Sequence, residues 1–259
     1  MQAQHSPPQF HAQDLVEHVV PYYQPIYSLM KNTVVRYECL ARLLDAQQNI
    51  YMPNEFLYIV EYHEDTANMT SRILEMSRAY CGPRQISWSV NLFDNDLSDK
   101  KLLNTITHMC KESSNKLCGI ELHFDSIKHD LVSVANMCKD NPNMHVTVDD
   151  IQARDINKFA TELYALVASG VHAIKVKAEV FNHCELDESA EHEKGSHSQS
   201  YSQVIRALQA HCNAHQCGLI AEHIEDERTL NAVKAAGIEF GQGYFLSQPS
   251  SKVVPIHSA

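Results

Sequence analysis

Short apolar runs alternate with helical patterns along this chain, and that alternation constrains the fold more than any other feature. The runs are rich in β-branched and aromatic residues, which favour strands. They cover residues 22–29, 34–40, 86–92, 117–122, 145–150, 172–177, 218–223 and 240–245. Strands that are apolar almost throughout and alternate with helices predict a parallel sheet covered by helices.

The stretches between the runs carry helical spacing. Two of them repeat apolar residues at i, i+3 and i+7, namely Leu103, Ile106 and Cys110, then Ile205, Leu208 and Cys212. Ser98 or Asp99 is expected to cap the first of these helices, and Gly237 is expected to follow the end of a later one.

The first two strands are separated only by residues 30–33. No crossover helix fits into so short a connection, so these strands are expected to pair antiparallel. The chain length of 259 residues is typical of a (β/α)8 barrel. A regular barrel of that kind, however, does not begin with an antiparallel pair.

Charge and composition exclude several classes of protein. The net charge of −11 argues against binding to duplex DNA or RNA, which usually needs a basic surface. Eight cysteines without a CxxC pair indicate buried free thiols in a reducing cytosol rather than disulfides. The polar N-terminus and the absence of an apolar run near 18 residues predict no secretion signal and no membrane span.

One segment, residues 183–202, is rich in His, Glu and Ser. Its composition predicts a solvated surface loop. A weak metal-binding tract is the alternative interpretation.

Polar residues stand at or near the ends of successive apolar runs. They are Glu38, Asn91, Glu121, Asp149, Asp150, Lys175, Glu222 and Gln242. The carboxyl ends of barrel strands converge on one face, where active sites of such barrels lie. Several carboxylates meeting there would repel one another, and hard divalent cations such as Mg²⁺ or Mn²⁺ would relieve that repulsion.

The adjacent pair Asp149 and Asp150 is the most informative part of this pattern. Neighbouring strand residues normally face opposite sides, but a turn of the backbone at the strand end lets both carboxylates reach one site. Two metal ions about 4 Å apart suit phosphoester hydrolysis. Any one of these polar residues alone is more often a helix cap, a turn residue or a surface charge, and only the joint pattern favours a site.

Eight short motifs, read in order, resemble the EAL domain family over roughly residues 20–250. They are YYQPIYSL, YECLARL, SVNLF, IELHF, VDDI, IKVK, AEHIE and GQGYFLSQP. The signature Glu-Ala-Leu stands here as Glu38-Cys39-Leu40. The middle side chain of that signature is not a metal ligand, so the departure is mild.

The resemblance implies a TIM-like (β/α)8 barrel with an antiparallel first strand over residues 20–259, after an N-terminal extension of residues 1–19. It implies metal-dependent hydrolysis of cyclic di-GMP to linear pGpG, with two Mg²⁺ or Mn²⁺ ions, in bacterial second-messenger signalling. A cytoplasmic location and a homodimer are among its expectations.

Roles follow from the resemblance position by position. Glu38, Asn91, Glu121 and Asp149 would hold one metal ion, and Asp149, Asp150 and Glu222 would hold the second, with Asp149 bridging. Lys175 would orient the attacking water. Arg42 would contact a substrate phosphate, and Gln24 and Pro249 would line the nucleotide site. Gln242 would reach the second metal ion, and Glu225 would support the catalytic group.

Three departures from the family pattern affect the surroundings of these residues. The Gly-rich turn that usually follows the aspartate pair is replaced by residues 151–155, which contain no glycine. Phe124 stands where a glutamate usually anchors that loop, and it cannot accept the same hydrogen bonds. Lys177 stands where an aspartate is common, two residues after Lys175.

Three functions remain open at this point. Retention of the expected metal ligands and of Lys175 favours a cyclic di-GMP phosphodiesterase, with reduced turnover because of the altered loop. The altered loop and Phe124 favour a module that binds cyclic di-GMP or a protein partner without hydrolysis. An unrelated phosphoesterase on the same scaffold is the third, since a fold does not fix a function.

Overall fold

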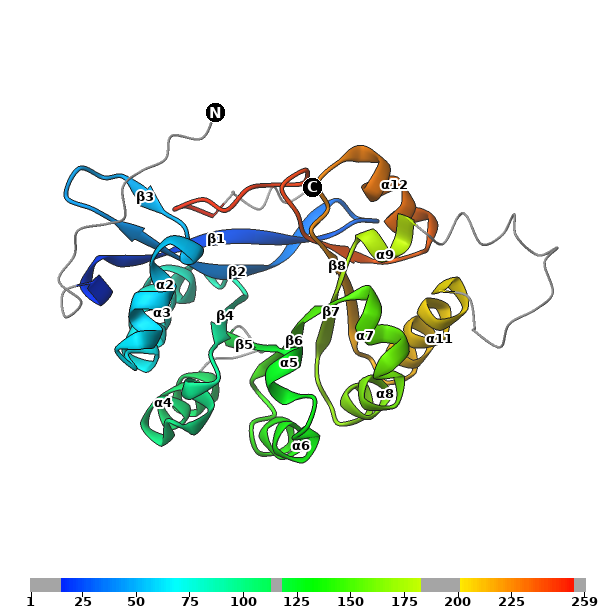
Figure 1. Cartoon of the computed structure of the whole chain (residues 1–259), viewed down its shortest axis with the longest axis horizontal. Coiled ribbons are helices and arrows are strands. Elements are labelled where there is room, and N and C mark those ends of the chain that lie inside the picture. The colour runs from blue at the N-terminus through cyan, green and yellow to red at the C-terminus, as the bar shows by residue number, and fades with distance from the viewer. Residues whose placement is uncertain (1–14, 113–117, 183–200, 254–259) are drawn as a thin grey trace.

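The protein is an eight-stranded barrel in a computed structural model, which describes residues 15–112, 118–182 and 201–253 (Figure 1). Neighbouring strands follow the order β1-β9-β8-β7-β6-β5-β4-β2, and pairing of β1 with β2 closes the ring. The strands are β1 (Val19–Ser28), β2 (Thr33–Leu44), β4 (Trp88–Leu92), β5 (Cys118–His123), β6 (His145–Ile151), β7 (Ala173–Lys177), β8 (Gly218–Glu222) and β9 (Phe240–Gly241). A short strand that the apolar pattern did not predict, β3 (Ile50–Tyr51), pairs with the end of β2.

Strand β1 runs against the rest of the barrel. It pairs antiparallel with β2 from Val19 opposite Leu43 to Ser28 opposite Thr33, and it pairs antiparallel with β9. The other pairings around the ring are parallel. The prediction of a barrel with an antiparallel first strand, made from the short connection and the family resemblance, is confirmed.

Helices cover the outside of the parallel strands, and Figure 1 shows α4, α6, α8 and α11 following one another along β4 to β8. The helices are α2 (Pro53–Tyr62), α3 (Thr66–Cys81), α4 (Lys100–Glu112), α5 (Phe124–Ile127), α6 (Leu131–Asp140), α7 (Ala153–Lys158), α8 (Ala160–Ala168), α9 (Glu179–Asn182), α11 (Tyr201–Ala214) and α12 (Glu227–Ala235). The described residues also contain the 3-10 helices η1 (Val16–His18), η2 (Gly82–Arg84) and η3 (Asn95–Ser98).

The helical spacing in the sequence marks the buried faces correctly. Ile106 and Cys110 of α4 are buried, as are the three predicted positions of α11. Asp99 caps α4, since its Oδ1 accepts a hydrogen bond from the backbone N–H of Leu102 at 2.9 Å. Gly237 follows α12 with a φ of 74°, a conformation that a side chain makes unfavourable.

The strands separate two apolar regions. In β7, Ile174 and Val176 belong to the large core beneath the helices, whereas Ala173 packs with Ile26 and Ile220 in a smaller cluster. Alternate residues of a strand face opposite sides, so Lys175 and Lys177 lie on the same face of β7 as Ala173, toward the barrel interior. The seven described cysteines are free and buried, as expected, and Cys184 lies outside the described residues.

The segment after the aspartate pair is not the loop that the sequence predicted. Ile151 is the last residue of β6, and α7 begins at Ala153. Asp155 starts this helix by accepting a hydrogen bond from the N–H of Gln152 at 3.0 Å. Burial of Ile151 and Ile156 holds the segment against the core. None of residues 151–155 adopts a positive φ, so no glycine is needed there.

Two expectations concern residues that are not described. Residues 183–200 of the His-rich segment lie outside the described ranges, so its prediction as a surface loop stays a prediction. The N-terminal extension also stays a prediction, since residues 1–14 lie outside them. None of the helices within the described ranges combines the length and the apolarity needed to cross a membrane.

Candidate active site

Polar side chains from β1, β2 and β5 to β8 gather at the end of the barrel where the parallel strands finish. A cavity of about 580 Å³ opens there. Its lining includes Gln24, Glu38, Arg42, Asp149, Asp150, Lys177, Glu222, Glu225 and Gln242. These residues are far apart in the sequence, and convergence of strand ends at one end of the barrel brings them together.

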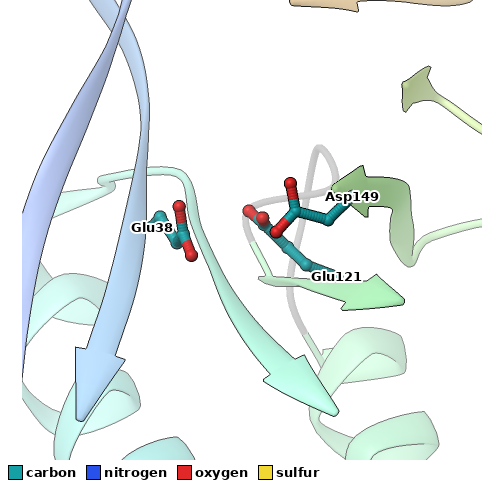
Figure 2. Close-up of side chains that lie close together, drawn as sticks. All are labelled: Glu38, Glu121 and Asp149. Atoms are coloured by element: carbon teal, nitrogen blue, oxygen red, sulfur yellow. The ribbon is translucent and has the colours of Figure 1, made fainter. Parts of the chain in front are cut away.

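Three carboxylates form a compact group at the base of this cavity. Glu38, Glu121 and Asp149 each offer an oxygen, and these oxygens lie within 4.8 Å of one another. Figure 2 shows Glu38 on β2 facing the carboxylates of Glu121 and Asp149. Among the described residues, this is the one group of three or more Asp, Glu, His or Cys side chains close enough to share a metal ion.

Lys175 lies against all three carboxylates. Its Nζ is 2.8 Å from Glu38 Oε2 and 3.6 Å from Asp149 Oδ1, and it also contacts Glu121 Oε2. The side chain is fully buried. Burial by itself would lower the pKa of Lys175, but the surrounding carboxylates raise this pKa well above its ordinary value. Lys175 is therefore a buried ammonium group rather than the solvent-facing strand charge that such a residue usually is.

Amide side chains hold Glu38 in place. Asn91 Nδ2 donates to Glu38 Oε1 at 2.7 Å, and Gln242 Nε2 donates to Glu38 Oε2 at 2.8 Å. Burial would raise the pKa of Glu38, but Lys175 and these two amides lower it. Glu38 is therefore an ionised, oriented carboxylate.

The pKa of Glu121 shifts in the opposite direction to that of Glu38. Burial and the nearby Glu38 raise the pKa of Glu121 to about 7, although Lys175 opposes this. Ser89 Oγ donates to Glu121 Oε1, while Glu121 Oε2 and Asp149 Oδ1 are buried and receive no regular hydrogen bond within the described ranges. Both of these oxygens face Lys175. Three crowded carboxylates that share one ammonium group keep an excess of negative charge, which a divalent cation could balance, so the first predicted metal position is compatible with the structure.

A bulge in β6 turns both aspartates toward the cavity. The register between β6 and β7 shifts between Val148 and Ile151, and Asp150 adopts a φ of 58°. Asp149 then faces Lys175, and Asp150 lies farther out. The expected backbone turn at this pair is thus present.

Asp150 and Glu222 are engaged by another cation. Lys177 contacts Asp150 Oδ1, and its Nζ lies 3.1 Å from Glu222 Oε1. His123 Nε2 lies 2.8 Å from the other oxygen of Asp150. Burial and the charge of Asp149 raise the pKa of Glu222 to about 8, although Lys175 and Lys177 oppose this. The residues expected to hold a second ion therefore surround an ammonium group, and they do not fit that ion as they stand.

The residues expected to contact substrate lie around the cavity. Arg42 is buried, its guanidinium lies 5.7 Å from the centroid of the Tyr22 ring, and its Nη1 donates to the Ala41 carbonyl. Gln24 donates to the Ser247 carbonyl at 3.3 Å. Glu225 is exposed at the edge.

Asn91 and Pro249, two further expected residues, do not line this cavity. Asn91 reaches the site through Glu38 rather than through the cavity lining. Pro249 is not part of the lining either, and it precedes Ser250, whose backbone pairs with Tyr23.

The model of the EAL domain family matches residues 11–249, which is most of the chain. The chain belongs to the EAL domain family. No curated protein sequence is similar to it at a significant level.

Solved EAL domains share the fold of this one. The FimX EAL domain of Pseudomonas aeruginosa, bound to c-di-GMP, has a TM-score of 0.73 at 19% identity, over 93% of this chain and 94% of that one. The FimX EAL domain of Xanthomonas citri, also with c-di-GMP, has a TM-score of 0.75 at 14% identity, over 93% of both chains. The Bacillus subtilis YkuI protein, in complex with c-di-GMP and calcium, has a TM-score of 0.72 at 19% identity, over 96% of this chain and 60% of that one.

Residues that the sequence did not mark also take part in the site of this EAL domain. His123 pairs with Asp150, and His223 Nε2 lies 3.0 Å from Lys177 Nζ. A signal for His123 was available, because it stands two residues after Glu121 in one strand and so shares its face. Phe124 is fully buried and packs edge-to-face on Phe159 at 5.7 Å, so apolar packing holds the segment after β6 instead of the usual glutamate.

Proposed function

We propose that this EAL domain binds cyclic di-GMP in the cavity at the barrel end and hydrolyses one of its phosphodiester bonds to give linear pGpG. The observation that carries the proposal is the group of Glu38, Glu121 and Asp149 around the buried ammonium of Lys175. A pure receptor needs neither a metal-binding group nor a buried cation beside it. Binding of c-di-GMP by the solved FimX and YkuI structures supports the choice of ligand.

Glu38, Glu121 and Asp149 would hold Mg²⁺ or Mn²⁺, with the carbonyl oxygen of Asn91 as a further oxygen ligand. When bound, the cation would act as a Lewis acid on the scissile phosphate and on a water molecule. Lys175 donates hydrogen bonds and is positively charged, so it orients a water and stabilises negative charge on the phosphate oxygens.

Substrate recognition falls to the residues farther out. The Arg42 guanidinium presents several donors in one plane, which suits a phosphate diester.

In the reaction the water oxygen bonds to phosphorus, the bond from phosphorus to a ribose oxygen breaks, and that oxygen takes up a proton. The locally positive side chains of Arg42, Lys175 and Lys177 offset the acidic charge of the chain for an anionic ligand.

A second candidate function is reception of cyclic di-GMP without useful turnover. The observation that favours it is Lys177, which engages Asp150 and Glu222.

A cytoplasmic location and a homodimer remain predictions.

Chromatography of cyclic di-GMP incubated with the protein and Mn²⁺ separates the two functions. The proposal predicts pGpG from the wild type and from Glu75→Gln, an exposed change on α3, and none from Glu38→Ala. Binding measured by calorimetry together with an unchanged nucleotide would instead support the receptor. Absence of both would exclude cyclic di-GMP as the ligand.

A further inference from the structure

Lys177 is directed into the site by the backbone register. It stands two residues after Lys175 in β7, so both side chains leave the strand on the same face. Its partner in the parallel pairing is Glu222 of β8. An extended strand that pairs in this way keeps the lysine stem beside Glu222.

The ammonium group lies among the side chains that a second divalent ion would need. It contacts Asp150 Oδ1 and lies 3.1 Å from Glu222 Oε1, and its side chain is only 20% exposed. His123 occupies the remaining oxygen of Asp150 at 2.8 Å. Both oxygens of Asp150 are therefore engaged by positively charged or hydrogen-bonding groups in this arrangement.

The two lysines differ in how many carboxylates surround them. Lys175 faces three carboxylates, whose combined negative charge exceeds its own by enough to accept a divalent ion. Lys177 faces two carboxylates, those of Asp150 and Glu222. Asp149, which was expected to bridge both metal ions, already belongs to the group around Lys175. A divalent ion placed beside Asp150 and Glu222 would meet the ammonium of Lys177 at contact distance and would be repelled.

The charge balance of the whole site leads to the same result. Five carboxylates, those of Glu38, Glu121, Asp149, Asp150 and Glu222, face the ammonium groups of Lys175 and Lys177. When all five carboxylates are ionised, one divalent ion leaves this group with a single negative charge, whereas two would leave it positive. Exchange of Lys177 for an aspartate changes the charge by two units, which is the charge of one divalent ion.

We propose that Lys177 is a tethered cation that replaces the second divalent ion, so that this EAL domain binds one metal ion per chain. The inference rests on the proposed metal-dependent function, but the metal count itself is independent of nucleotide and of turnover. Asp150 and Glu222 then serve to hold the ammonium, and Lys177 supplies a fixed positive charge at the outer part of the cavity.

The test counts Mn²⁺ ions in the absence of nucleotide. Equilibrium dialysis gives the number bound per chain, and electron paramagnetic resonance distinguishes an isolated Mn²⁺ from a magnetically coupled pair. The variants are Lys177→Asp and Lys177→Met, of which the second keeps the length of the stem without its charge. Lys101→Asp on the exposed side of α4 makes the same charge change away from the site.

The wild type and Lys101→Asp are expected to bind one Mn²⁺ with an uncoupled spectrum, and Lys177→Asp is expected to bind two with a coupled one. Lys177→Met, checked for folding by circular dichroism, should bind the second ion more weakly than Lys177→Asp. A coupled pair in the wild type would overturn the inference. So would a single ion in both folded Lys177 variants. Correct metal counts without any pGpG would overturn the proposed hydrolysis and leave this inference standing.

Discussion

Lys177 Nζ lies 3.1 Å from Glu222 Oε1, and the two residues are direct partners in the parallel pairing of β7 with β8. Lys175, two residues earlier, is fully buried among Glu38, Glu121 and Asp149. One strand thus supplies two ammonium groups at different depths. The deeper one affects stability and chemistry, and the outer one affects how many metal ions bind.

Lys175→Met is expected to abolish pGpG formation and to destabilise the metal-free protein. Removing one partner of a buried ion pair leaves unpaired charge and typically costs about 3–5 kcal/mol. Added Mn²⁺ should restore much of this stability, because it supplies positive charge to the same carboxylates. Urea unfolding with and without Mn²⁺ measures both effects, and equal stability of wild type and variant in EDTA would contradict the buried ion pair.

Stability of the metal-free protein should fall as the pH rises from about 6 to 9. The pKa values of Glu121 and Glu222 are raised to about 7 and about 8 by burial, so the folded state binds more protons than the unfolded chain in this range. Stability present at low pH is therefore lost as the pH passes these values. The pKa of His223 is lowered by burial and by Lys177. Titration of His223 therefore makes stability rise with pH, but only at pH values below the ordinary pKa of histidine.

Thermal melting in EDTA across this pH range measures the effect. Glu121→Gln should flatten the dependence, because a glutamine does not titrate. A wild type whose melting temperature rises steadily from pH 6 to 9 in EDTA would contradict the raised pKa values.

Arg42→Lys should weaken binding of cyclic di-GMP by roughly tenfold or more, because a point charge replaces a planar group with several donors. The buried guanidinium also lies near Tyr22, and a lysine would lose that contact. Calorimetry with Mn²⁺ present gives the dissociation constants. Unchanged affinity would remove Arg42 from the phosphate-binding residues.

Phe124→Ala should cost about 3–5 kcal/mol of stability, the usual range for removing a buried aromatic side chain. Phe124→Leu fills more of the space and should cost less. Both should loosen α7, because Phe124 packs on Phe159 directly after that helix. Urea unfolding and hydrogen exchange of residues 151–159 measure these effects, and unaltered exchange in Phe124→Ala would contradict the packing role.

Much of the fold could be predicted because each feature depends on local sequence. The short connection after β1 fixes its antiparallel pairing with β2, and the apolar runs mark the eight strands of the barrel. The strand β3 was missed because Ile50 and Tyr51 form too short a run to show a period. The helix α7 was missed because the family pattern directed attention to a missing glycine, while Asp155 was already available to cap a helix.

The candidate site was predictable only as a set of strand-end residues. Glu38, Glu121 and Asp149 share one end of the barrel by topology, so their proximity follows from the fold. The contacts of Lys177 with Asp150 and Glu222 depend on strand register and on the bulge in β6, which no local pattern encodes. The sequence marked Lys177 as a departure but did not indicate that it would lie where a second ion was expected.

The most direct test of hydrolysis at this site is a single-turnover experiment with the protein in excess over cyclic di-GMP and Mn²⁺ present, analysed by chromatography. Excess protein detects hydrolysis even when turnover is slow. Linear pGpG is expected to form with the wild type, EDTA is expected to prevent this, and Glu38→Gln is expected to give none. Cyclic di-GMP that stays intact while fully bound to the wild type would contradict hydrolysis at Glu38, Glu121, Asp149 and Lys175.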